Sequence, residues 1–230
     1  MRRLPVYLLI DCSGSMMGEP IEAVKVGLQT MTSALRTDPY ALETVHLSVI
    51  TFSQQATQSV PLTELVQFQV PDIHASGTTA LGEALALLAQ CIERDVKKTT
   101  PDSKGDWKPV CFLLTDGQAT DDLNRGIAAL RNVKMGTLVA CAAGPSANTA
   151  ELRKITESVV SLDTADSSTL KAFFQWVSAS VSVSSQKIER GGKEADGLSE
   201  LPPAPARNQP RALKPGIRTT SNRKRYSIWQ

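Results

Sequence analysis

Five short apolar runs, separated by longer segments of helical periodicity, organise the first 180 residues of this chain. Three of them, VYLLI, VCFLLT and TLVACAA, have almost no polar positions. Strands that are apolar on both faces are typical of a parallel sheet covered by helices on both sides. We therefore predict an α/β fold with a doubly wound, mostly parallel central sheet flanked by helices, and with strands at residues 6–10, 46–52, 110–115, 137–143 and 159–162.

The segments between these runs carry apolar residues at intervals of three and four, which is the period of an amphipathic helix. In the first of them, Ile21, Val24 and Leu28 share one face. The stretch 60–70 is bracketed by two prolines, which is typical of the edge of a sheet. The predicted helices lie at residues 21–35, 81–93, 122–132, 151–156 and 168–180.

The chain changes character near residue 186. Residues 1–186 hold 15 basic and 19 acidic residues (net −4), whereas residues 187–230 hold 10 and 4 (net +6). The second part is rich in proline and has almost no aliphatic periodicity, so it lacks the apolar surface needed to offset the entropy of ordering. We predict one domain over 1–186 and a disordered basic tail over 187–230. The end of the tail, RKRYSIW, is either a solvated terminus or a docking motif. The candidates for phosphorylation in the tail are Thr219, Thr220, Ser221 and Ser227.

Two further features concern the compartment. The apolar run after the first two arginines ends at Asp11, which is too early for a signal peptide or a membrane span. None of the later apolar runs is long enough for a membrane span either. We predict a cytoplasmic protein without a membrane span. The four cysteines are scattered without CxxC spacing, which favours reduced thiols in the core: Cys12, Cys91, Cys111 and Cys141.

Polar residues follow the first and the third of the apolar runs directly. Asp11, Ser13 and Ser15 occupy alternate positions after VYLLI, and Asp116 follows VCFLLT in a Thr-Asp-Gly turn. In doubly wound sheets, ligands bind at the carboxyl ends of the strands. Carboxylate and hydroxyl oxygens are hard donors that suit Mg²⁺. We therefore predict a magnesium site at this edge.

These motifs, together with GTTALGEAL at residues 77–85, resemble the von Willebrand factor A family. In that family, a metal-ion-dependent adhesion site is built from DxSxS, a threonine of a later loop and an aspartate in a TDG-like turn. The resemblance implies Asp11, Ser13, Ser15 and Asp116 as metal ligands, with Thr79 favoured over Thr78 as the threonine. It also implies a protein partner that supplies an Asp or Glu carboxylate to the metal, which is Mg²⁺ or alternatively Mn²⁺ or Ca²⁺.

The opening RRLPVYLLIDCSGSMMGEPIEAVKVGLQ is most similar to the bacterial tellurite-resistance TerY group and its YegL-type relatives within that family. This similarity implies a non-enzymatic adaptor in a tellurite-resistance, stress or defence signalling system. The implied partners are a Ser/Thr protein kinase and a PP2C-type phosphatase.

The alternative is a metal-dependent phosphatase or hydrolase that uses Asp11 and Asp116. Haloacid-dehalogenase-type phosphatases need a second aspartate two residues after the first, where this chain has Ser13. Nucleotide-binding loops of the GxxxxGK[ST] and GxGxxG types are absent from the sequence. The basic tail has no aromatics interleaved before Tyr226, which argues against specific nucleic-acid binding.

Three smaller expectations concern the surroundings of the site. Cys12 is expected to point into the core rather than to serve as a redox group on the metal loop. Asp121 and Asp122 are expected to cap the next helix, the alternative being that they orient the loop after the Thr-Asp-Gly turn. For Met16 and Met17, core packing and exposure at the rim of the site are both open.

Overall fold

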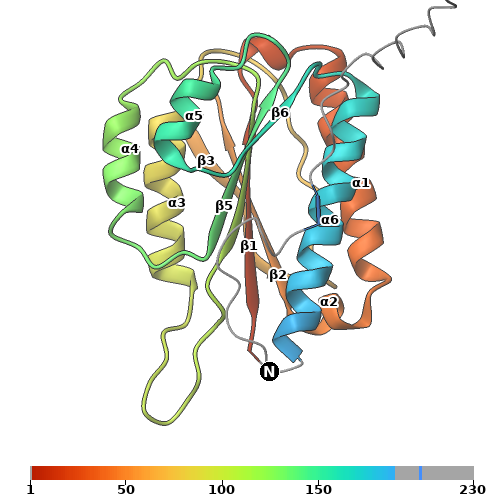
Figure 1. The fold of residues 1–230 in the computed structure, drawn as a ribbon, viewed down its shortest axis with the longest axis vertical. Helices are drawn as coiled ribbons and strands as arrows, with labels where there is room; N and C mark the ends of the chain where they lie inside the picture. The colour runs from red at the N-terminus through yellow and green to blue at the C-terminus, as the bar shows by residue number, and fades with distance from the viewer. Residues whose placement is uncertain (1, 190–201, 204–230) are drawn as a thin grey trace, which may run out of the picture.

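A six-stranded sheet in the order β3-β2-β1-β4-β5-β6 forms the centre of the molecule (Figure 1). We describe residues 2–189 and 202–203 of this computed structural model. All neighbouring strands run parallel except β3, which pairs antiparallel to β2 at the edge. The strands are β1 (Leu4–Asp11), β2 (Val45–Phe52), β3 (Ala56–Glu64), β4 (Val110–Thr115), β5 (Thr137–Ala143) and β6 (Val159–Leu162).

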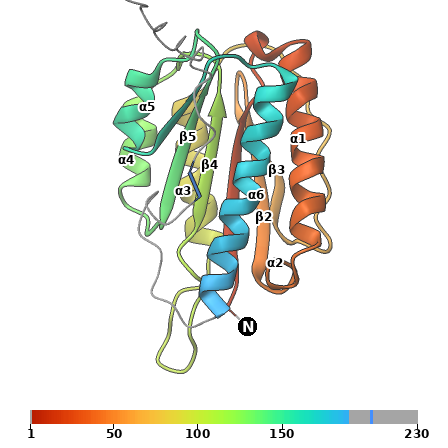
Figure 2. The same cartoon turned by 45° about the vertical axis from the view of Figure 1, so that its right-hand side comes forward.

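Helices cover both faces of the sheet, as Figure 2 shows: α1, α2 and α6 lie on one face, and α3, α4 and α5 on the other. A short 3₁₀ helix, η1 (Gly14–Met16), precedes α1. The predicted doubly wound α/β fold is thus confirmed. The α-helices are α1 (Glu19–Arg36), α2 (Pro39–Thr44), α3 (Leu81–Asp95), α4 (Leu123–Leu130), α5 (Thr149–Ile155) and α6 (Ser167–Glu189).

The apolar strands bury side chains on both faces because the side chains of a strand alternate in direction. In β1, Val6 and Leu8 join the core under α1 and α6, whereas Tyr7 and Leu9 join the core under α3 and α4. Burying apolar area at roughly 25 cal/mol per Å² on both sides makes β1 a main source of stability. The four cysteines are buried and unpaired, as predicted.

The elements differ from the predicted ones mainly at their ends. Helix α6 was predicted at 168–180 but continues to Glu189, nine residues beyond its predicted end and three beyond the predicted end of the domain. Its serine-rich second half obscures the apolar period, but Ser180 and Ser184 donate their hydroxyl hydrogens to carbonyls four residues back. Helix α2 was not predicted, because six residues are too few to show a period. Its N-cap is Asp38, which accepts from the amide of Tyr40 at 3.0 Å.

The predicted disorder of the tail falls on residues 190–201 and 204–230, which lie outside the described residues. In the part of the chain that is described, no helix has the length and apolarity to cross a membrane.

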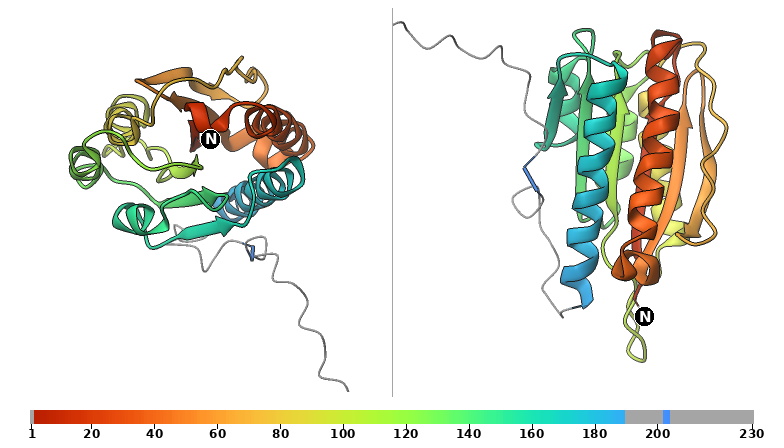
Figure 3. Two further views of the ribbon diagram at one scale, coloured as in Figure 1. Left: turned by 90° about the horizontal axis from the view of Figure 1, so that it is seen from above. Right: turned by 90° about the vertical axis from the view of Figure 1, so that its right-hand side faces the viewer.

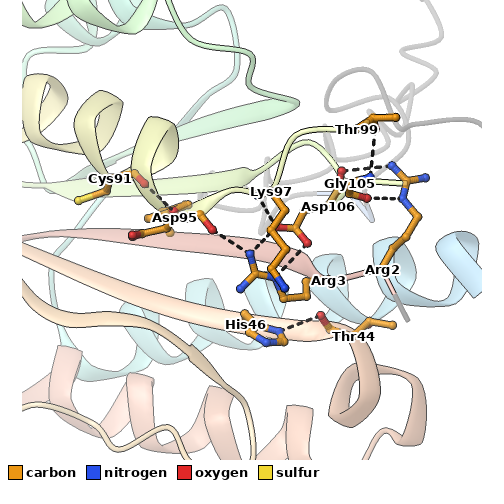
Figure 4. A network of polar contacts seen from close by, with 11 residues as sticks. Arg2, Arg3, Thr44, His46, Cys91, Asp95, Lys97, Thr99, Gly105 and Asp106 are labelled. Atoms are coloured by element: carbon orange, nitrogen blue, oxygen red, sulfur yellow. Dashed lines mark hydrogen bonds and ion pairs between the residues drawn. The ribbon is translucent and has the colours of Figure 1, made fainter. Parts of the chain in front are cut away.

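A polar network closes the amino-terminal end of the sheet (Figure 4). Arg3 donates from Nε to Asp106 Oδ1 at 2.9 Å and forms an ion pair with the same carboxylate. The backbone amide of Lys97 also donates to it, at 2.7 Å. Burial alone would raise the pKa of Asp106, but these hydrogen bonds outweigh it and the pKa is lowered. The network thus ties the chain before β1 to the loop before β4.

We expect Asp106→Asn to lower the free energy of unfolding at pH 7 by about 1–3 kcal/mol, because Arg3 loses a buried charged acceptor. The folded state lowers the pKa of Asp106, so its stabilisation is complete above the unfolded value of about 3.9 and is lost as the pH falls through the folded value. Urea unfolding at pH 7 and near pH 2 measures both effects. An equally large difference between variant and wild type at both pH values would refute the ionic contribution.

Candidate metal centre

Two loops meet at the carboxyl edge of the sheet because β1 and β4 are parallel neighbours, with Ile10 opposite Leu114. Asp11 ends β1, and Asp116 is the first residue after β4, so both lie at this edge of the sheet. Asp11 is fully buried and Asp116 is 8% exposed. Two carboxylates therefore lie at one edge of the sheet with little access to water.

Asp11 is held by donors on both of its oxygens. Oδ1 accepts from the backbone amide of Ser13 at 2.8 Å, and Oδ2 accepts from the hydroxyl of Thr115 at 2.5 Å. Thr115 is itself fully buried at the end of β4. The carboxylate of Asp11 is thus fixed in orientation before any ligand binds.

A chain of hydroxyl groups links the first loop to Asp116. Ser13 Oγ and Ser15 Oγ lie 3.0 Å apart, and Ser15 Oγ donates to Asp116 Oδ1 at 2.6 Å. Ser13 is buried whereas Ser15 is exposed. The oxygen cluster therefore reaches solvent on the side of Ser15.

The loop before α3 completes this edge. Its backbone bonds to the first loop twice, from the Ser76 amide to the Cys12 carbonyl at 2.8 Å and from the Gly14 amide to the Gly77 carbonyl at 3.0 Å. Gly77 has φ of +73°, a left-handed conformation that favours glycine. The second contact needs a close approach, since a Cβ on Gly14 would lie 3.2 Å from that carbonyl oxygen.

Thr79, rather than Thr78, lies against the cluster. Thr79 is 5% exposed, whereas Thr78 is exposed to solvent. A Cβ placed on Gly117 would lie 3.4 Å from Thr79 Oγ1 and 3.8 Å from Ser15 Oγ, so both hydroxyls border the Thr-Asp-Gly turn. The five sequence-predicted site residues are therefore brought together at this edge.

The loop after β4 is anchored to the start of α3. Thr120 Oγ1 accepts from the Thr79 amide at 3.0 Å, and the Thr120 amide donates to the Thr79 carbonyl at 2.9 Å. Asp122 caps α4, as predicted. Asp121 instead accepts from the amides of Gly82 and Glu83 in the first turn of α3. The contacts of Thr120 and Asp121 thus hold the loop after β4 against the loop before α3 and the first turn of α3.

The surroundings of the cluster leave its negative charge uncompensated. Burial raises the pKa of both Asp11 and Asp116, although hydrogen bonds from Ser13, Thr115 and Ser15 partly oppose it. Within residues 2–189 and 202–203, no ion pair includes either carboxylate. Two carboxylates with neighbouring hydroxyls fit a hard divalent cation, which would neutralise them. In the same part of the chain, no group of three or more His, Cys, Asp and Glu residues is placed to hold a metal ion.

Cys12, Met16 and Met17 lie next to the site, and their burial decides whether each side chain packs in the core or faces solvent. Cys12 is buried, as predicted, and burial raises the pKa of its thiol to about 12. Met16 is fully buried, whereas Met17 is 65% exposed in the turn before α1. An apolar side chain thus stands in solvent two residues from Ser15.

Sequence reasoning did not assign a role to Thr115, although it lies in the Thr-Asp-Gly turn. Its hydroxyl reaches Asp11 across 104 positions of sequence, and only the register of β1 against β4 reveals that contact. A buried threonine that ends an apolar strand beside an aspartate was the available signal.

A comparison with protein-family models matches residues 6–176 to the von Willebrand factor type A domain. A comparison with curated proteins found no match.

Solved structures of low sequence identity share the fold. Proximal thread matrix protein 1 from the mussel byssus, in a structure described as having a zinc-occupied MIDAS motif, is 21% identical with a TM-score of 0.55 over 80% of this chain and 46% of that one. A von Willebrand factor type A structure from Catenulispora acidiphila is 22% identical with a TM-score of 0.56, over 79% and 43%. The pilus adhesin SpaC from Lactobacillus rhamnosus GG is 14% identical with a TM-score of 0.62, over 79% and 30%. The chain spans less than half the length of these relatives.

Proposed function

Because this chain belongs to the von Willebrand factor type A family, we propose that it is a non-enzymatic protein-binding module that captures its partner through a divalent cation. One observation carries the proposal. Two buried carboxylates and a chain of hydroxyls meet at the carboxyl edge of the sheet without a basic residue paired to them in the described part of the chain.

The proposed ligands are the five oxygen donors of this edge. Mg²⁺ is our first choice, because carboxylate and hydroxyl oxygens are the donors it prefers, and Mn²⁺ or Ca²⁺ would suit the same set. The zinc-occupied motif of the mussel protein supports a divalent metal at this kind of site. The ligands in this proposal are Asp11, Ser13, Ser15, Thr79 and Asp116.

The charge of the site determines the partner. Two carboxylates balance one divalent cation, and the hydroxyls add no charge. When bound, the cation would supply an electrophilic position for an oxygen from outside. We assign that position to an Asp or Glu carboxylate of a protein partner. The exposed Met17 lies close enough in sequence to Ser15 to contact the same partner.

The cellular role that we propose follows from the resemblance of the opening sequence to the tellurite-resistance TerY group. In this proposal, residues 1–186 form the binding domain and residues 187–230 a basic tail. The protein acts in the cytoplasm as an adaptor in a tellurite-resistance or stress signalling system. Its partners are a Ser/Thr protein kinase and a PP2C-type phosphatase. Loss of tellurite tolerance on deletion, restored by the wild-type chain but not by a site variant, is the expected phenotype.

Affinity capture of partners by the full-length protein, with Mg²⁺ or with EDTA, tests the binding function. We expect EDTA to release partners that bind at the metal and to leave any tail-bound partner in place. Equal capture of every partner in both buffers would contradict a metal-dependent role. Turnover of a generic phosphoester that is lost in an Asp11 variant would instead favour the phosphatase alternative.

The two neighbouring threonines give a matched pair of variants. We expect Thr79→Ala to weaken Mn²⁺ binding by about 10-fold, because one oxygen donor is lost from the cluster, and Thr78→Ala to leave it unchanged. Titration calorimetry with MnCl₂ measures both. If only Thr78→Ala lost Mn²⁺ affinity, Thr78 and not Thr79 would be the ligand.

A further inference from the structure

The indole of Trp176 in α6 donates its Nε1–H to the carbonyl oxygen of Pro202 at 2.8 Å. The two residues are 26 positions apart. Figure 3 shows the short piece of chain at 202–203 close to α6 and to the β6 edge of the sheet. A residue of the proline-rich region thus returns to the folded domain.

The ring of Trp176 is held rigidly from the other side. It meets Phe112 of β4 edge-on, with ring centroids 5.9 Å apart, and it packs beside Phe173 at 6.0 Å. Trp176 is 6% exposed. The core therefore fixes the direction in which the indole N–H points, and burial of an indole donor favours a conformation that supplies an acceptor.

The acceptor belongs to a segment that suits such a donor. The sequence at 201–206 is LPPAPA. Proline fixes φ near −65° and removes the backbone donor, so a proline-rich segment is already extended and offers mainly carbonyl acceptors. Grooves lined by aromatic side chains recognise such segments in other proteins because little entropy is lost on binding.

We propose that the edge of Trp176 is a docking site for the Pro202-Pro203 pair of the chain's own LPPAPA segment. This pair would attach the proline-rich region to the folded domain at α6.

Hydrogen exchange of the tryptophan indole N–H groups in the full-length protein, measured by NMR, tests the docking. We expect the double variant Pro202→Gly, Pro203→Gly to exchange the Trp176 N–H about fivefold to tenfold faster than wild type, because the hydrogen bond loses its restrained acceptor. The variant keeps both backbone carbonyls, so it tests proline recognition specifically. Trp176→Phe assigns the resonance.

Two controls make the result decisive. The indole of Trp107, whose Nε1 has no partner among the described residues, should exchange at the same rate in both proteins. The double variant Pro210→Gly, Pro215→Gly alters prolines of the same tail outside the segment and should leave Trp176 unchanged. Unchanged exchange of Trp176 in the Pro202, Pro203 variant would overturn the proposal, as would an equal increase in the control variant.

Discussion

An Asp11→Asn variant should lose divalent-cation binding, with an affinity for Mg²⁺ and Mn²⁺ reduced by more than about 100-fold. Changes to residues that only support a ligand cost about 10–100-fold, and loss of a ligand's charge should cost more. Asp11 is fully buried and supplies half of the charge that would balance the cation. Capture of the partner should disappear together with the metal.

Asparagine is suited to this test because it keeps the shape of the side chain. Its amide oxygen can still accept from the Ser13 amide, so the first loop should keep its fold. Titration calorimetry with each metal gives the affinity, and urea unfolding with EDTA confirms that the domain is intact. Asp38→Asn removes the same charge at the start of α2 and should bind metal normally. Wild-type affinity in Asp11→Asn would exclude this carboxylate as a ligand.

We expect the Thr115→Val variant to bind the metal about 10–100-fold more weakly than wild type, which is the second large effect. Valine fills nearly the same volume in the buried end of β4 but cannot donate to Asp11 Oδ2. The carboxylate would then lose the hydrogen bond that orients one of its two oxygens. Thr115 acts only by positioning Asp11.

The conservative variant Thr115→Ser separates positioning from packing. It keeps the hydroxyl and loses a methyl group, so metal binding should return to near the wild-type value while stability falls slightly. The same metal titrations measure this rescue. Weak binding in Thr115→Ser together with normal binding in Thr115→Val would reverse the assignment and make the methyl group the important feature.

The sequence predicted the sheet better than the outer elements. Strands 110–115, 137–143 and 159–162 are observed with the predicted bounds. The first two are fully buried, and buried parallel strands need continuous apolar runs. Edge structure was predicted at 60–70, and the edge strand β3 lies at Ala56–Glu64, so its first residues were not predicted. A half-exposed edge tolerates polar residues and even Pro61, so its start leaves little apolar signal.

For the candidate site too, the sequence predicted the residues that depend on local spacing and strand order better than the contacts between loops. Local spacing places Asp11, Ser13 and Ser15 in one loop, and strand order brings Asp116 to them. The burial of Thr79 and the contact of Thr115 with Asp11 depend on how three loops pack together. Such contacts come from backbone hydrogen bonds between distant segments, which no local pattern records.

A crystal structure of the full-length protein with Mn²⁺, with an anomalous difference map at the manganese edge, shows whether the five oxygen donors hold a divalent cation. We expect one strong peak at the carboxyl edge of the sheet, bounded by Asp11, Ser13, Ser15, Thr79 and Asp116. A map without a peak at that position under saturating Mn²⁺ would contradict the proposed metal site.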